Sequence, residues 1–411
     1  MLATISCTSP TDDERTLKLW AMGREGEVVA QLLPEFEKEH PGIRVQVQQI
    51  PWSAAHEKLL TAYVGDATPD IAMLGNTWVP EFVALDALEP LDSRVAASKD
   101  IVKSDYFQGI WDTNTVDSVT YGIPWYVDTR VIFYRSDLLA SAGCPQMPST
   151  WATWRQCMVQ LKSKMNDHQY PLLIPITEWP PIVILGLQAG SPILRDDGRF
   201  GGFSEPKFMK AFNVYVQLFR DGLAPPFAGT EISNLYQEFE RGNIAMYISG
   251  PWQIGEFSTR LPKDMQDKWM TAALPGVDGP GVSLAGGASL SLFRGSTHKA
   301  EAWQLMEFLS RPNVQVRFHQ LTGDLPPRRA AWDDPVLSGN KYATAFHEQL
   351  ERAVPTPKVP EWEQIATKIF EHGERAVRGN QTPQQAMAAL DRDVDRILEK
   401  RRWLMDHEAK Q

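Results

Sequence analysis

Cysteine is scarce in this chain, with three among 411 residues. None belongs to a C-x-x-C pair or lies near histidines at metal-ligand spacing, so the sequence predicts no metal site and no cofactor. The spacing of Cys144 and Cys157 is compatible with a disulfide in an oxidising compartment and equally with two free thiols. The cysteine content therefore excludes a scaffold stabilised by cysteine-bound metal. It does not decide whether Cys144 and Cys157 form a disulfide.

Long hydrophobic runs and clustered basic residues are also missing. The longest apolar candidate, Ile182 to Leu187, follows Pro180-Pro181 and is far shorter than the roughly 20 residues that span a bilayer. The formal net charge is −10, and the Lys and Arg residues are scattered. A nucleic-acid surface needs clustered cations, so we expect no nucleic-acid partner.

The first residues are small and apolar up to Cys7 and then turn polar. This pattern resembles the tail of a bacterial lipoprotein signal, with Cys7 as the lipidated residue. The alternative is a plain flexible start. In both cases we expect residues 1–12 to lie outside the fold.

The composition that remains is that of a globular protein, with 43% hydrophobic and 22% charged residues. A chain of 411 residues exceeds one ordinary core, so about two domains are expected. Strand, helix, strand, helix and strand patterns follow one another over residues 17–20, 28–36, 43–49, 54–64 and 71–74. Such alternation predicts an α/β fold with a parallel sheet.

A second α/β unit is predicted further along the chain. Strands are expected at residues 131–134 and 244–248. Helical periodicity covers residues 151–165, 207–220, 299–309, 342–353, 362–377 and 383–403. The final helix should begin at the Thr382-Pro383 cap.

Polar and aromatic side chains follow the predicted strand ends, where ligands bind in open α/β sheets. Glu25, the segment from Pro51-Trp52 to His56, and Asn76 with Trp78 converge on one edge of the first sheet. In the second unit Trp252 follows a strand and the rigid Ser249-Gly250-Pro251 turn, so that it can offer a flat apolar face. The alternative is a Trp252 packed in the core beneath a loop.

Several segments spread along the chain resemble the extracellular solute-binding proteins of bacterial ABC sugar importers, maltose- and trehalose-binding proteins above all. The segments that carry the resemblance are 36–43 (FEKEHPGI), 69–71 (PDI), 88–92 (LEPLD), 121–124 (YGIP), 133–139 (FYRSDLL), 239–246 (FERGNIAM), 250–252 (GPW) and 382–386 (TPQQA). Their order and spacing extend the resemblance from about Leu17 to about Leu398.

The resemblance implies the type II periplasmic binding fold, in which two α/β lobes with a discontinuous chain close on a ligand by a hinge. The first lobe would comprise residues 13–124 and 276–325, and the second residues 125–275 and 326–411. The crossings would fall near Pro124, between Pro275 and Gly287, and between Leu325 and Arg328.

The resemblance also implies the site. Trp252 would stack on a sugar ring; Glu25, Asn76 and Asp128 would bind hydroxyls; and Arg328, or its neighbour Arg329, would reach in from the last crossing. The ligand-binding residues predicted in all are Glu25, His56, Asn76, Trp78, Tyr126, Asp128, Trp179, Trp252, Gly286, Gly287 and Arg328. The chain departs from some relatives at His56, at Gly75 in place of an Asp, and at Ala288 in place of a second Trp, which affects the choice of sugar.

The predicted function is that of a monomeric periplasmic receptor, without cofactor or catalytic residues. It would bind a disaccharide or oligosaccharide of the maltose or trehalose type and deliver it to an ABC permease. One alternative keeps the fold but binds a polyamine through acidic and aromatic groups. Another is a glycoside hydrolase that uses carboxyls from Glu25, Asp128 or Glu178.

Overall fold

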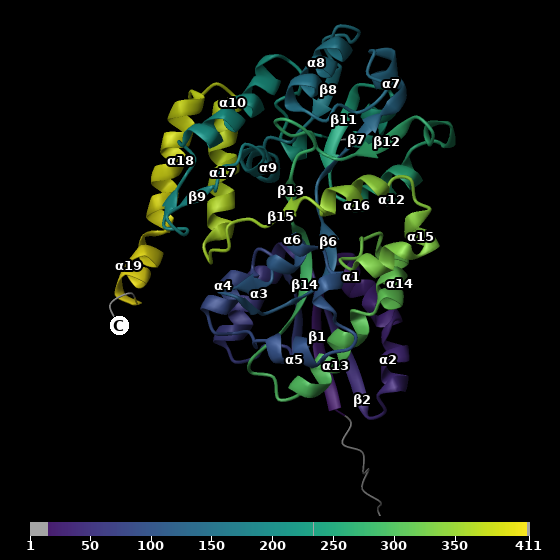
Figure 1. Cartoon of the computed structure of the whole chain (residues 1–411), viewed down its shortest axis with the longest axis vertical. Helices are drawn as coiled ribbons and strands as arrows, with labels where there is room; N and C mark the ends of the chain where they lie inside the picture. The colour runs from purple at the N-terminus through teal and green to yellow at the C-terminus, as the bar shows by residue number, and fades with distance from the viewer. Residues whose placement is uncertain (1–14, 233, 409–411) are drawn as a thin grey trace, which may run out of the picture.

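A five-stranded sheet forms the core of one half of the computed structural model, which describes residues 15–232 and 234–408 (Figure 1). Cys7 lies outside these residues. The strand order is β2-β1-β3-β14-β6. The strands are β1 (Arg15–Met22), β2 (Ile43–Ile50), β3 (Ile71–Gly75), β6 (Ile123–Asp128) and β14 (Gly286–Leu292). β1 runs parallel to β2 and β3, as predicted, whereas β14 runs antiparallel to β3 and β6.

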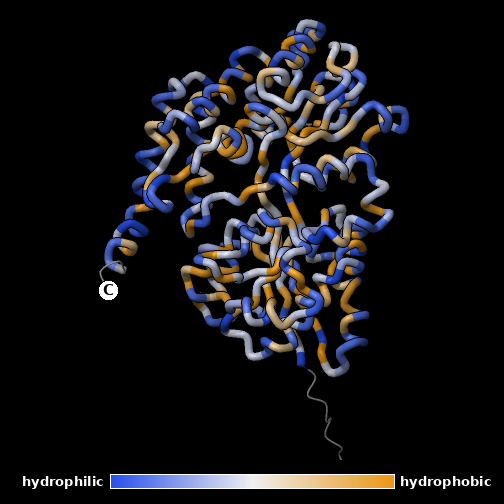
Figure 2. Tube along the Cα trace, viewed as in Figure 1, coloured by the Kyte–Doolittle hydropathy of each residue, from blue (hydrophilic) through white to orange (hydrophobic). Residues whose placement is uncertain are grey.

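Short amphipathic helices pack on this first sheet. They are α1 (Gly23–Val28), η1 (Val29–Gln31), α2 (Leu33–Glu39), α3 (Trp52–Val64), α4 (Val79–Ala84), α5 (Asp92–Ala97), α13 (Lys299–Leu309) and α14 (Pro312–Thr322). Leu19, Phe36, Met73, Leu290 and Leu305 are fully buried in the core between the sheet and these helices. In Figure 2 the hydrophobic residues concentrate in the interior of this half.

The other half contains a four-stranded sheet of order β12-β7-β11-β8. Its strands are β7 (Val131–Arg135), β8 (Tyr170–Leu173), β11 (Ile244–Ser249) and β12 (Trp269–Ala272). Its helices include α8 (Trp151–Lys162), α9 (Pro180–Gln188), α10 (Pro206–Arg220), α12 (Trp252–Arg260), α17 (Trp362–Val377) and α18 (Pro383–Ile397). Met246, Phe212 and Ile369 are buried in its main core.

The chain passes between the two halves at three places. It leaves the first sheet after Asp128 and enters the second at Val131. It returns through β13 (Ser283–Leu284), which pairs with β15 (Ala353–Val354), and it crosses again at Leu325, whose backbone pairs with Val127. A third buried cluster, including Phe107, Val127, Phe257, Leu325 and Phe346, packs around these crossings.

The first crossing falls slightly later than the predicted boundary at 124/125. β14 holds β6 in the first sheet as far as Asp128, because Gly286 pairs with Asp128 and Ala288 with Tyr126. The second passage, around Leu284, lies after the lobe boundary drawn at 275/276 but inside the range Pro275 to Gly287 given for that crossing. Further helices are α6 (Gln108–Asp112), α7 (Ser136–Ser141), α11 (Leu235–Glu240), η5 (Arg329–Asp333), α15 (Pro335–Ser338) and α16 (Thr344–Leu350).

The predicted C-terminal helix is divided into α18 and α19 (Glu399–Glu408), and α19 extends away from the body of the molecule (Figure 1). Its start is as predicted: the Thr382 hydroxyl accepts a hydrogen bond from the Gln385 backbone at 3.2 Å, and the Gln385 side chain accepts one from the Thr382 backbone at 3.0 Å. No described helix has both the length and the apolar character needed to cross a membrane.

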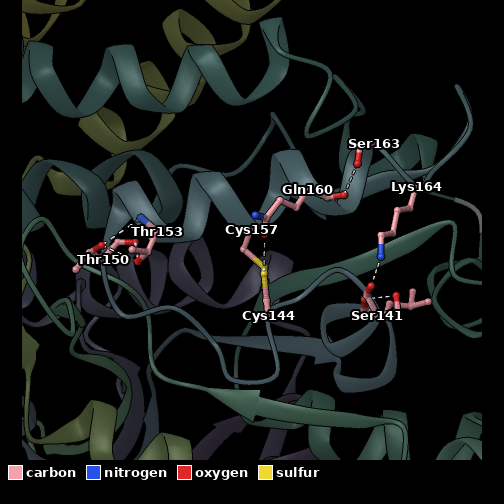
Figure 3. Close-up of a disulfide and its surroundings, with 9 residues drawn as sticks. Ser141, Cys144, Thr150, Thr153, Cys157, Gln160, Ser163 and Lys164 are labelled. Carbon is pink, nitrogen blue, oxygen red and sulfur yellow. Dashed lines mark hydrogen bonds between the residues drawn. A yellow bond between two sulfur atoms is a disulfide. The ribbon is translucent and has the colours of Figure 1, made fainter.

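A disulfide joins Cys144 and Cys157, so the structure answers the question that their spacing left open (Figure 3). The two Cα atoms are 6.1 Å apart. The bond ties the loop after α7 to the buried face of α8, where Cys157 packs in the core.

Candidate functional site

A cavity of about 530 Å³ lies where the two halves meet. The first half contributes side chains that follow β1, β2 and β3, the second half contributes the starts of α9, α12 and α17, and the crossings supply the floor. The residues that line the cavity include Glu25, Trp52, Asn76, Thr77, Trp78, Tyr126, Asp128, Arg130, Trp179, Trp252, Gly286, Gly287, Asp324 and Glu363. Pockets between domains commonly bind small molecules.

Two buried carboxyl groups meet in one wall of the cavity. Glu25 lies in the first turn of α1, directly after β1, and its side chain interacts with those of Asp324 and Tyr126. Burial raises the pKa of Glu25, and burial together with the nearby charge of Glu25 raises the pKa of Asp324 well above its ordinary value. Like charges in contact favour a state in which the pair shares a proton.

Glycines bring the backbone of β14 against the cavity. Gly287 has a φ of +120°, and a Cβ atom there would lie 2.2 Å from the carbonyl oxygen of Tyr126. Asn76 holds this segment, since its Nδ2 donates to the Ala285 carbonyl at 2.7 Å and its backbone N–H donates to the Gly287 carbonyl at 3.1 Å. Asn76 and Gly287 thus build the floor together.

Tryptophans line the cavity from both halves. Trp52 and Trp78 of the first half meet edge to face with ring centroids 5.7 Å apart. Trp252, the first residue of α12 in the second half, is 39% exposed. A Cβ at Gly250 would lie 2.1 Å from the Trp252 ring, so glycine allows this ring to fold back over the strand end. Two sides of the cavity therefore present flat apolar surfaces.

An acid and a cation follow the end of β6. Burial raises the pKa of Asp128, while the charge of Arg130 opposes this shift. The Arg130 Nη2 atom lies 3.6 Å from Asp128 Oδ2, and its guanidinium carbon lies 4.8 Å from the centre of the Trp252 ring. The cavity thus combines several carboxyl groups with one guanidinium and aromatic rings.

Most of the residues predicted from the sequence come together here. The cavity is lined by Glu25, Asn76, Trp78, Tyr126, Asp128, Trp179, Trp252, Gly286 and Gly287. Two predicted residues, His56 and Arg328, do not line it.

Arg328 is buried between structural partners. Its Nε donates to Asp105 Oδ2 at 2.6 Å, and its Nη1 donates to the carbonyls of Asp100 at 2.6 Å and Ser310 at 2.8 Å. The guanidinium fixes the last crossing to the first half and does not extend into the cavity. Its neighbour Arg329 instead forms an ion pair with Glu351.

His56 lies behind the aromatic wall. Its Nε2 is 2.6 Å from Glu81 Oε2, and its ring centroid is 5.1 Å from that of Trp78. The bond to Glu81 raises the pKa of His56. The histidine therefore supports Trp78 from behind.

The predicted ligand-binding residues lacked Arg130, Asp324 and Glu363, and Trp52 was named only as part of the segment from Pro51-Trp52 to His56. Arg130 carried a signal, because it follows Asp128 by two residues. The other two did not, since Asp324 and Glu363 reach the cavity only through long-range packing. Glu363 accepts a hydrogen bond of 2.6 Å from the Thr77 hydroxyl and so links the two halves at the cavity. No group of three or more His, Cys, Asp or Glu side chains suited to a metal occurs in residues 15–232 and 234–408.

Comparisons with known proteins agree with this arrangement. Residues 22–316 match the family of bacterial extracellular solute-binding proteins. The chain is 49% identical to the sugar-binding protein MalE from Xanthomonas citri, with a TM-score of 0.93 over 95% of this chain and 99% of that one. It is 23% identical over 379 residues to the diacetylchitobiose binding protein DasA of Streptomyces coelicolor, covering 88% of this chain and 87% of DasA. It is 24% identical over 387 residues to the galactooligosaccharide-binding protein of Bacillus subtilis, covering 90% of this chain and 86% of that protein.

The fold and the cavity define a two-lobed binding protein of the type II periplasmic class. The chain belongs to the family of bacterial extracellular solute-binding proteins.

Proposed function

We propose that this protein is the sugar receptor of an ABC importer. It binds a disaccharide or oligosaccharide of the maltose or trehalose type between its lobes, closes on it by a hinge, and delivers it to the membrane permease. The protein acts as a monomer in the periplasm, tethered through a lipid on Cys7, without cofactor and without catalysis.

The observation that carries this proposal is the pairing of aromatic and polar surfaces in the cavity. Trp52 and Trp78 line it from one half, and Trp179 and Trp252 line it from the other. Sugars expose apolar C–H faces and a rim of hydroxyls, so aromatic planes and hydrogen-bonding side chains complement them. Charged partners strengthen such hydrogen bonds roughly twofold over neutral ones.

The relatives support a sugar as the cargo. A protein of known structure that is 49% identical to this chain is described as sugar-binding, and two more distant relatives are named for binding diacetylchitobiose and galactooligosaccharide. The closest carboxyl pair does not suit retaining hydrolysis. Glycosidases of the retaining class keep their two carboxyls about 5–5.5 Å apart, whereas Glu25 and Asp324 share a hydrogen bond.

A polyamine remains a second candidate, because the cavity contains the carboxyl groups of Glu25, Asp128, Asp324 and Glu363. An ammonium group could neutralise such a set and stack on tryptophan. The guanidinium of Arg130 in the same cavity opposes a polycation, and the raised pKa values of Glu25 and Asp324 favour less negative charge on these two groups.

Isothermal titration calorimetry with maltose, trehalose, maltotriose and spermidine tests the proposal. We expect saturable binding of at least one sugar, with Kd in the micromolar range or below, and no binding of spermidine. Binding of spermidine alone would replace the sugar with a polycation. Release of glucose or of a chromogenic aglycone from a bound glycoside would contradict a purely binding role.

A further inference from the structure

Arg130 is held firmly at the crossing between the two sheets. Its backbone N–H donates to the Ser283 hydroxyl at 3.1 Å, and the same hydroxyl donates to the Arg130 carbonyl at 3.0 Å. Ser283 is fully buried in β13, which pairs with β15. The backbone from which this side chain enters the cavity is therefore fixed on both sides.

Within residues 15–232 and 234–408, the guanidinium of Arg130 has no hydrogen-bond acceptor. Its side chain is 17% exposed and contacts Asp128 at 3.6 Å and the Trp252 ring. Its charge also opposes the rise that burial causes in the pKa of Glu178. A separation of 3.6 Å is too long for a hydrogen bond. Five N–H donors on a group that keeps its charge are costly to leave without acceptors once water is displaced.

Other buried arginines of this chain differ in this respect. Arg328 donates to three oxygen atoms, as described above. Arg135 donates to both carboxylate oxygens of Asp137 and to the carbonyls of Phe239 and Glu240. The fold thus supplies acceptors where an arginine is structural, and at Arg130 it supplies a cavity instead.

A complementary acceptor lies beside it. The Oδ1 atom of Asp128 is covered and has no hydrogen-bond donor among the described residues, whereas the side chain as a whole is 26% exposed. Next to Trp252 the cavity therefore offers the donors of Arg130 and the accessible part of the Asp128 carboxyl group. A sugar ring supplies neighbouring oxygens that accept and hydroxyl hydrogens that can be donated.

We propose that Arg130 is a ligand-contacting residue that determines specificity, which deepens the proposed function and rests on it. The planar fork of the guanidinium donates to two neighbouring oxygens of the sugar unit beside Trp252, and Asp128 accepts from a hydroxyl of the same unit. The ligand at this subsite is a neutral sugar with adjacent oxygens. An acidic sugar would suit the guanidinium but would be repelled by the carboxyl groups of Glu25, Asp128, Asp324 and Glu363.

The first test compares affinity and folding in Arg130→Gln, Arg130→Lys and a control, Arg260→Gln. Arg260 lies on α12 like Trp252 but is exposed and paired with Glu256. For the sugar that the wild-type protein binds, we expect about a ten- to hundredfold weaker Kd in Arg130→Gln, a partial loss in Arg130→Lys, and no change in the control. Because no described residue accepts a hydrogen bond from the Arg130 guanidinium, the Tm of Arg130→Gln should equal or exceed that of the wild type. Unchanged affinity in Arg130→Gln would overturn the proposal.

The second test uses monodeoxy analogues of the same sugar in a double-mutant cycle. Removing the hydroxyl that Arg130 contacts should weaken binding to the wild-type protein, but should weaken binding to Arg130→Gln much less. Equal losses in both proteins for every analogue would assign Arg130 a purely structural role. Tighter binding of a uronic-acid analogue would show that the subsite takes an acidic sugar and would contradict the neutral ligand. If the wild-type protein binds no sugar at all, the proposed function itself fails, which is a separate result.

Discussion

The carboxyl groups of Glu25 and Asp324 lie together in the cavity wall, where the charge of Glu25 raises the pKa of Asp324. Both side chains are buried, and burial is the largest cause of the raised pKa of each. A carboxyl with a raised pKa binds more protons in the folded than in the unfolded state. Its contribution to the free energy of unfolding therefore falls as the pH rises above the ordinary carboxyl pKa of about 4.

Asp324→Asn should remove this pH-dependent destabilisation. The difference in Tm, variant minus wild type, is expected to grow more positive between pH 4 and pH 8, because only the wild-type pair must give up its proton. Differential scanning calorimetry across this range measures it, with Asp278→Asn, on an exposed turn, as the control. If the difference in Tm stays constant or falls as the pH rises, the carboxyl pair does not destabilise the folded protein.

Cavity residues that follow strand ends could be predicted from the sequence, because ligands in open α/β sheets bind where the strand ends meet at one edge. Glu25, Asn76 and Trp252 were found in this way and all line the cavity. Arg328 was assigned by resemblance, and the sequence could not show that Asp105 and two carbonyls already use its donors. Asp324 lies far from Glu25 in sequence, so no local pattern could predict their contact.

The disulfide stabilises the second half of the molecule at the level of its helices. It closes a loop with a sequence separation of 13, and loops of about this length give roughly 3 kcal/mol of stabilisation. Replacing both Cys144 and Cys157 by Ala should lower the free energy of unfolding by about 2–4 kcal/mol in chemical denaturation. Neither residue lines the cavity, so sugar affinity should not change. A reductant should destabilise the wild type and leave the double variant unaffected; equal sensitivity of both would contradict the bond.

The start of β14 depends on a conformation that only glycine adopts easily. Gly287→Ala would place a methyl group 2.2 Å from the Tyr126 carbonyl at a φ of +120°. We expect at least about 2 kcal/mol lower stability, measured by denaturant unfolding, together with weaker sugar binding. Gly255→Ala on the exposed face of α12 is the matched control, since nothing lies within 4 Å of its added Cβ, and it should stabilise by about 0.5–1 kcal/mol. Equal effects of the two substitutions on stability would show that the contact between a Cβ at position 287 and the Tyr126 carbonyl does not destabilise the fold.

Helices with a single clear apolar periodicity were predicted well. β6 and α14 were not predicted, because their sequences combine features of different structures. α13 and α17 begin and end where their apolar stripes predict. β6 was taken for a crossing because it contains Pro124, but β6 is an edge strand of the sheet, where proline is tolerated. In α14 the apolar residues Val314, Val316 and Phe318 alternate as they would in a strand, so the sequence alone does not identify this helix.

At the scale of the whole molecule, one hydrogen bond links the halves at the cavity. The Thr77 hydroxyl donates to Glu363 Oε1 at 2.6 Å, and bonds to charged groups contribute about 1.5–3 kcal/mol. Thr77→Val should therefore favour separated lobes, with a larger radius of gyration in small-angle scattering of the unliganded protein and faster sugar release. Thr77→Ser, which keeps the hydroxyl, should behave like the wild type. Identical scattering and release rates in the wild type and Thr77→Val would contradict this role.

The division into two lobes followed from chain length, the repeated α/β pattern and the family resemblance. The first crossing point lies several residues later than expected because strand pairing, which no local composition encodes, holds β6 in the first sheet through Asp128. The shape of the cavity between the lobes depends on three separate passages of the chain and was therefore beyond prediction.

The central claim is that the cavity binds a sugar against Trp252. The most direct test is titration of intrinsic tryptophan fluorescence with maltose, trehalose, sucrose and spermidine, on the wild type and on Trp252→Ala. We predict a saturable change with one of the disaccharides in the wild type and at least a tenfold weaker Kd, or no binding, in the variant. Unchanged sugar affinity in Trp252→Ala, or a response of the wild type to spermidine and to none of the sugars, would contradict the account.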